Sequence, residues 1–125
     1  MTKTIYLDNG ATTKLDPEVA KAITKAPFGN ASSTHHVGME AKHSLEEARK
    51  TIAKSIQASS DEIYFTSGGT ESNNLALKGV AFANKQKGKH IITTKIEHDC
   101  ILNSCKFLEE DGFKVTYLNV NKEGF

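Results

Sequence analysis

The sequence predicts an α/β fold with a mostly parallel sheet and flanking helices. Short runs of β-branched and aromatic residues alternate along the chain with longer segments of helical periodicity. Those segments are long enough to connect one strand to a parallel neighbour. The composition, with 38% hydrophobic and 25% charged residues, is that of a globular chain. No linker-like segment interrupts it, so we expect one domain over residues 1–125.

The first part of the chain is the least regular. We expect a small strand at residues 5–7, a turn at 8–10, and a short helix that opens at Asp16 and Pro17, because proline suits the first helical position. A longer amphipathic helix follows and ends near Gln57. Its apolar positions recur at steps of three and four residues: Ala41, Leu45, Ala48, Ile52 and Ile56.

The second half reads as strand, helix, strand, helix, strand. The first of its helices begins at about Thr70, after two glycines. The second begins near Asp99, which could cap it, and ends at Asp111 and Gly112. The strands are expected at residues 63–65, 91–94 and 115–120.

Charge and hydropathy exclude several classes of protein. The formal net charge is +1, so nothing indicates binding of nucleic acid or of an anionic membrane surface. No apolar stretch approaches the roughly 18 residues of a membrane helix, and no signal peptide is visible at the start. We therefore expect a cytoplasmic protein.

The two cysteines, Cys100 and Cys105, are too few for a disulfide scaffold and do not form a CxxC pair. We expect both to be reduced, buried and structural. His98 lies two residues before Cys100, but neighbours at that spacing on a helix point in different directions. A nucleophilic pair is therefore not expected.

The sharpest local signal is the segment TSGGTESNN at residues 66–74, where a strand runs through glycines into a helix. Glycines let a ligand approach the backbone, and the unpaired N–H groups of a first helical turn favour an anion such as phosphate. Thr70 adds a hydroxyl donor. The alternative is an ordinary strand-to-helix turn with Thr70 as its N-cap. The segment matches neither the dinucleotide nor the P-loop pattern.

His98 follows the next strand, at the sheet edge where α/β proteins usually bind ligands. Its imidazole could stack on a ring, donate a hydrogen bond or carry a proton. Alternatively, Asp99 or the backbone holds it at a helix start. The polar segment 29–38 contains His35 and His36 but no ligands at metal-binding spacing, so we expect no metal site. His43 and His90 are expected at the surface.

Four segments together resemble the beginning of a cysteine desulfurase of the NifS/IscS type, in the class-V aminotransferase family. They are YLDNGATT at 6–13, FGNASSTH at 28–35, TSGGTESNN at 66–74, and Glu97 with His98. The resemblance implies part of the large domain of a pyridoxal-phosphate enzyme of fold type I. It implies that Gly69 and Thr70 hold the phosphate of pyridoxal 5'-phosphate. It also implies that His98 stacks on the cofactor ring and acts catalytically in proton transfer.

The resemblance further implies a homodimer that converts L-cysteine to L-alanine and an enzyme-bound persulfide. That sulfur would pass to an acceptor or an iron-sulfur scaffold protein, for cluster assembly or thiolation. The Schiff-base lysine and the persulfide cysteine loop of the family are not found in this sequence. We therefore expect the N-terminal portion of such an enzyme, incomplete at its C-terminus and inactive alone unless a C-terminal fragment complements it. The alternative is an inactive remnant that binds phosphate or another protein.

Overall fold

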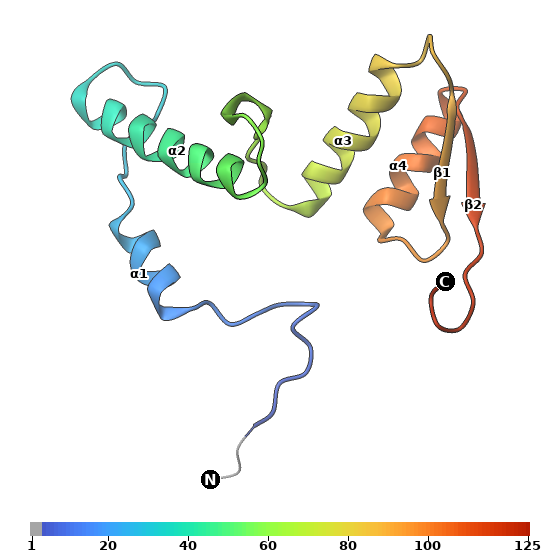
Figure 1. The fold of residues 1–125 in the computed structure, drawn as a ribbon, viewed down its shortest axis with the longest axis horizontal. Helices are drawn as coiled ribbons and strands as arrows, with labels where there is room; N and C mark the ends of the chain where they lie inside the picture. Colours follow the sequence, from blue (N-terminus) through green and yellow to red (C-terminus); the bar gives the residue numbers. More distant parts are fainter. Residues whose placement is uncertain (1–3) are drawn as a thin grey trace. The chain divides into compact units, whose positions relative to one another are not determined.

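The computed structural model describes residues 4–125 and divides the chain into two compact units. The first unit ends at Tyr64, and the second runs from Phe65 to Phe125. Each is described by itself below (Figure 1). The expectation of a single domain stays a prediction. Among the described residues, no helix combines the length and the apolar character that crossing a membrane requires.

The first unit holds two α-helices, α1 (Pro17–Lys25) and α2 (His36–Ser55), and a 3-10 turn, η1 (Ser60–Glu62). Asp16 caps α1 by accepting the Glu18 N–H at 2.8 Å, and Pro17 occupies the first turn as expected. The long helix was predicted correctly and begins somewhat earlier than its apolar pattern. The residues of that pattern beyond Ala41 are exposed in the described chain, Leu45 by 38% and Ile52 by 42%.

The polar segment 29–38 folds tightly against the start of α2. A Cβ atom on Gly29 would lie 2.2 Å from the carbonyl oxygen of Val37. One on Gly38 would lie 2.6 Å from the Cβ of Ser33. His35 caps α2, because its Nδ1 accepts the N–H of Gly38 at 3.3 Å. The two glycines are therefore required by close packing.

The second unit contains α3 (Gly69–Ala83), β1 (His90–Thr94), α4 (Asp99–Glu110) and β2 (Lys114–Leu118). The strands form a parallel two-stranded sheet in which Ile91 pairs with Val115 and Thr94 with Leu118. Helix α3 packs against α4, and α4 packs against β2 (Figure 1). The predicted α/β class and its parallel pairing are confirmed.

The core of this second unit lies where the helices meet the sheet. Ala81, Leu108 and Phe113 are buried there, and Leu77 and Ile91 pack against them. Leu108 is fully buried, and burial of a leucine side chain stabilises a fold by about 2 kcal/mol. Gly112 ends α4 as predicted: it adopts φ 84°, and the Phe113 N–H returns to the Leu108 carbonyl at 2.9 Å.

Three local predictions were wrong. No strand forms at residues 5–7 or 63–65, although Ile63 has extended dihedral angles. A strand exists only where a neighbour supplies a hydrogen-bonding ladder, and in the described residues only β1 and β2 supply one to each other. The helix cap at α4 is His98, and Asp99 is already the first helical residue.

Candidate functional site

The start of helix α3 leaves backbone donors unused. Gly68 is its N-cap residue and has no side chain to accept a hydrogen bond. The first backbone bond of the helix runs from the Ser72 N–H to the Gly68 carbonyl at 3.1 Å. Within residues 4–125, the N–H groups of Gly69 and Thr70 meet no acceptor. This arrangement is the one that binds anions at helix starts.

The side chains around this turn keep it in place. Glu71 turns back and accepts hydrogen bonds from the Ser67 hydroxyl at 2.6 Å and the Ser67 N–H at 2.7 Å. These bonds, the hydroxyl bond first, lower the pKa of the Glu71 carboxyl. The Thr66 hydroxyl lies 2.6 Å from that of Ser72. The negative charge of the Glu71 carboxylate is thus compensated by the two hydrogen bonds that Ser67 donates.

Helix α4 begins differently, because an imidazole caps it. His98 has extended dihedral angles, and its Nδ1 accepts the backbone N–H of Cys100 at 3.1 Å. The Sγ atom of Cys100 lies 3.0 Å from the same nitrogen. The prediction that these two side chains diverge was therefore wrong. His98 stands outside the helix, so its ring folds back over the first turn, and the spacing rule for helical neighbours does not apply.

The two helix starts border one cavity of about 400 Å³. Its lining residues are Gly69, Thr70, Asn73, His98 and Cys100. The structure therefore brings the three predicted site residues together. Thr70 lies inside α3, and Gly68 is the N-cap, so the assignment of Thr70 as the N-cap is wrong. Among residues 4–125, no lysine and no carboxylate belongs to the lining of this cavity.

Sequence reasoning missed Asn73 and Cys100. Asn73 Nδ2 donates to Cys100 Sγ at 3.2 Å and so joins α3 to α4. Thr70 and Asn73 are three residues apart, a spacing that places both on one face of a helix. From this spacing Asn73 could have been predicted as a residue of the same site as Thr70. Both cysteines are buried, as predicted, with 9% of Cys100 and none of Cys105 exposed. Burial, followed by the charges of Glu109 and Glu97, raises the pKa of the Cys105 thiol.

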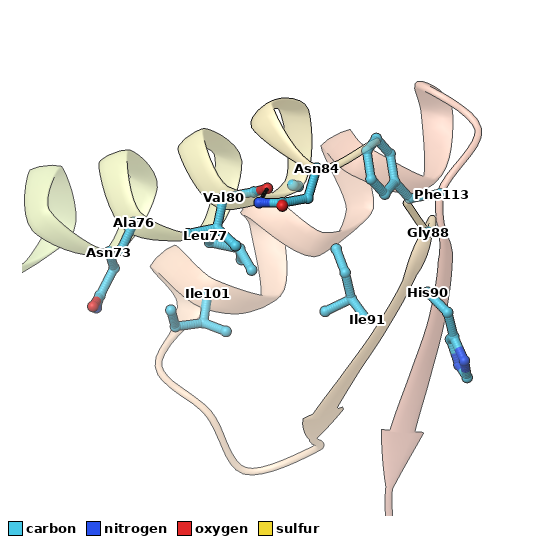
Figure 2. A pocket seen from close by; sticks show the side chains of 11 residues that line it. Asn73, Ala76, Leu77, Val80, Asn84, Gly88, His90, Ile91, Ile101 and Phe113 are labelled. Atoms are coloured by element: carbon cyan, nitrogen blue, oxygen red, sulfur yellow. Dashed lines mark hydrogen bonds between the residues drawn. The ribbon is translucent and has the colours of Figure 1, made fainter. Parts of the chain in front are cut away.

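A larger hollow of about 520 Å³ lies beside this site in the same unit (Figure 2). Leu77 and Val80 of α3, Ile91 of β1 and Ile101 of α4 surround it, and its wall is largely apolar. Asn73 lines both spaces. The smaller cavity is the better candidate for the site, because it alone of the two is bordered by the two helix starts and by His98.

The remaining histidines lie elsewhere. His36 pairs with Glu40 at 3.5 Å on the exposed side of α2. His43 and His90 are exposed, as predicted, and His90 contacts the Thr116 hydroxyl at 2.7 Å. Over residues 4–125, no three His, Cys, Asp or Glu side chains gather into a group that could hold a metal ion.

Known proteins resemble the chain along its whole length. The family model of class-V aminotransferases matches residues 5–125. The cysteine desulfurase IscS of Dictyoglomus turgidum is 59% identical over 128 residues, covering 100% of this chain and 32% of the relative. That of Methanosarcina thermophila is 52% identical, covering 98% of this chain and 31% of the relative. The chain thus spans about a third of the length of these curated relatives.

Solved structures agree with the sequence comparison. A NifS-like protein superposes with a TM-score of 0.79 at 42% identity, covering 88% of this chain and 31% of that one. A structure described as SspA in complex with cysteine gives 0.81 at 42% identity, covering 92% of this chain and 34% of that one. The predicted resemblance and fold are confirmed: the chain belongs to the class-V aminotransferase family and is similar to the NifS/IscS cysteine desulfurases.

Proposed function

We propose that this chain is the N-terminal part of a cysteine desulfurase that uses pyridoxal 5'-phosphate. The observation that carries the proposal is the shared cavity, which is lined by His98 and by Gly69 and Thr70, whose N–H groups are unused among the described residues. A phosphate needs donors, and a pyridine ring needs a flat partner. The high identity to desulfurases supports the same assignment.

The residues present fit the cofactor. Apart from its chain neighbours and the backbone of α3, no atom of residues 4–125 lies within 4 Å of a Cβ built on Gly69, so the backbone there is open to a ligand. The Thr70 hydroxyl has no hydrogen-bond partner among the described residues and can donate to a phosphate oxygen. The dipole of α3 favours an anion at the same place.

The bound cofactor would supply an electron sink for the carbanion formed at the substrate. This chain's own residues would bind and orient it. Gly69 and Thr70 would hold the phosphate, and His98 would cover the ring and move a proton. The Nε2 atom of His98 has no hydrogen-bond partner in residues 4–125, so it is available for that step.

The activity of the whole enzyme would be the removal of sulfur from L-cysteine, leaving L-alanine and an enzyme-bound persulfide. The sulfur would go to an acceptor or an iron-sulfur scaffold protein. No lysine lines the cavity, so the covalent attachment of the cofactor would need a residue from elsewhere. We propose that the 125-residue chain alone releases no sulfide, and that a homodimer or a complementing C-terminal fragment completes the site.

Titration with pyridoxal phosphate, followed by absorbance and by competition with inorganic phosphate, tests the proposal. We expect the chain to bind the cofactor, Thr70→Val to weaken binding of both ligands, and His98→Gln to weaken binding of the cofactor alone. Thr51→Val and His43→Gln are matched controls, because both residues are exposed on α2 in the other unit. Equal losses in the controls, or cysteine-dependent sulfide release by this chain alone, would contradict the proposal.

The absence of lysine from the cavity lining favours one alternative, a phosphate-binding or protein-interaction module without chemistry. That module would bind inorganic phosphate as tightly as pyridoxal phosphate, because the start of α3 would supply all of the binding affinity and the His98 ring none. A preference for pyridoxal phosphate that disappears in His98→Gln excludes it.

A further inference from the structure

We propose that Asn73 and Cys100 are positioning residues for His98, and that their hydrogen bonds determine which nitrogen of its ring carries the proton. The inference deepens the proposed function and rests on it only for the identity of the ligand, pyridoxal phosphate, that the His98 ring would cover. The contacts themselves lie within the second unit, residues 65–125.

The three side chains form a directed chain of hydrogen bonds. Asn73 Nδ2 donates to Cys100 Sγ at 3.2 Å, and Sγ lies 3.0 Å from His98 Nδ1. A thiol has one proton. Because the sulfur already accepts the amide N–H, its own proton is directed to the imidazole.

The imidazole nitrogen therefore receives two donors. The thiol of Cys100 is one, and the backbone N–H of Cys100, at 3.1 Å, is the other. A nitrogen that accepts hydrogen bonds carries no proton, so in the neutral ring the proton resides on Nε2. His98 thus presents an N–H donor from the nitrogen that is not engaged in capping.

The chain of bonds also connects the two halves of the site. Asn73 follows Thr70 by three residues on α3, whereas Cys100 and His98 belong to the start of α4. All four residues line the same cavity. The amide that orients the thiol therefore belongs to the helix whose start would hold the phosphate, and the ring is held relative to that start.

Nitrogen NMR of the 125-residue chain labelled with [15N]histidine tests the inference without any cofactor. The resonance of His98 is assigned with His98→Gln. We expect Cys100→Ala to move the Nδ1 resonance toward that of a less hydrogen-bonded acceptor, and Cys100→Ser to restore it. An Nδ1 resonance that is unchanged in a folded Cys100→Ala variant overturns the proposal.

Two changes at Asn73 test the direction of the bonds. In Asn73→Asp a carboxylate accepts the thiol proton, so the Nδ1 resonance should move as it does in Cys100→Ala. In Asn73→Ala the amide no longer orients the thiol, so the resonance should move only part of the way toward that of Cys100→Ala. A larger Nδ1 shift in Asn73→Ala than in Asn73→Asp would overturn the assignment of the amide as donor and the thiol proton as directed to the ring.

Ser104→Ala is the matched control for general loosening of the helix pair. The Ser104 hydroxyl is buried and lies 2.7 Å from the backbone carbonyl oxygen of Cys100 and 3.0 Å from Asn74 Oδ1. It therefore also joins α4 to α3, but it contacts neither the thiol nor the imidazole. It should leave Nδ1 unchanged. An equal shift in Ser104→Ala would reduce Cys100 to a structural residue and overturn the proposal.

Binding of pyridoxal phosphate separates this inference from the proposed function. We expect Cys100→Ala to bind the cofactor about threefold to tenfold more weakly, with reduced induced circular dichroism, and to bind inorganic phosphate normally. If the wild type binds the cofactor and Cys100→Ala matches it, the positioning role fails while the function stands. If the wild type does not bind it but Nδ1 responds, the function fails while the hydrogen-bond chain stands.

Discussion

Helices α3 and α4 begin at the same cavity, yet their first turns are built in opposite ways. At α3 a glycine occupies the cap position, and no side chain in the described part of the chain accepts the N–H groups of Gly69 and Thr70. At α4 the ring of His98 accepts the Cys100 N–H and closes the turn. An uncapped start keeps donors for a ligand at some cost in helix stability. A start capped by an imidazole keeps its stability and also exposes a ring.

The largest effect is expected when α3 is made to resemble α4. In Gly68→Asp, the new carboxylate would cap the Thr70 or Glu71 N–H and repel an anion, so phosphate should bind about 30-fold more weakly. Gly68→Ala is the control, because a Cβ there meets nothing within 4 Å and adds no charge. Isothermal titration with phosphate measures both variants.

The same substitution should raise stability while it lowers affinity. A carboxylate at an N-cap stabilises a helix relative to glycine by a few tenths of a kcal/mol. If Gly68→Asp instead lost phosphate affinity because it unfolds, urea denaturation would show a lower free energy of unfolding than that of the wild type. Phosphate affinity that survives in a more stable Gly68→Asp protein would contradict an anion site at this turn.

A second effect distinguishes the two thiols of α4. Cys100 lines the cavity, whereas Cys105 is fully buried with a raised pKa. In the folded chain at pH 8, we expect iodoacetamide to modify Cys100 at least about tenfold faster than Cys105. Peptide mass spectrometry at timed intervals gives both rates. Bound phosphate should slow only the reaction of Cys100, and equal rates would show that the cavity does not admit the reagent.

The third effect separates the two roles of His98. His98→Ala removes the cap and should lower the free energy of unfolding by about 1 kcal/mol. His98→Asn restores a capping side chain but not the ring, so it should recover most of that stability without recovering cofactor binding. Urea denaturation and cofactor titration of the same two proteins provide the comparison. Binding restored in His98→Asn would mean that the ring contributes nothing.

The smallest effect concerns the turn before α3. Because hydrogen bonds from Ser67 lower the pKa of Glu71 in the folded chain below its ordinary value of 4.5, the ionised carboxylate stabilises the fold above that pH. As the pH falls below 4.5 and through the folded pKa, this contribution is lost. The difference in unfolding free energy between the wild type and Glu71→Gln should therefore shrink from pH 6 to pH 3. A difference that is independent of pH would contradict it.

Local patterns predicted the elements whose stabilising contacts lie close in sequence. Helices α2, α3 and α4, the strands near residues 91–94 and 115–120, and the glycine end of α4 at Gly112 were all predicted. The strands at 5–7 and 63–65 were not formed, because β-propensity describes a side chain's fit to a sheet and cannot supply the neighbouring ladder.

The candidate site was predicted in part for a similar reason. Gly69, Thr70 and His98 belong to patterns with a local physical meaning, and the cavity brings them together. The burial of Cys100 was predicted correctly, but its contact with His98 was missed because the prediction treated His98 as a helical residue. Its extended dihedral angles place it before the helix and let its ring reach the thiol. Contacts across helices, such as that of Asn73 with Cys100, have no signature in a single sequence.

The adjacent asparagines of α3 have a consequence for the alignment of the two helices. Asn73 bonds to Cys100 and Asn74 to Ser104, and both bonds are partly buried. Apolar surfaces tolerate sliding, but polar groups match only at one offset. A slip by one turn, about 5.4 Å, would separate both donor-acceptor pairs at once. The alignment of the two helices that border the cavity is thus fixed by two amides, and replacing both with leucine would permit several alignments where the native chain permits one.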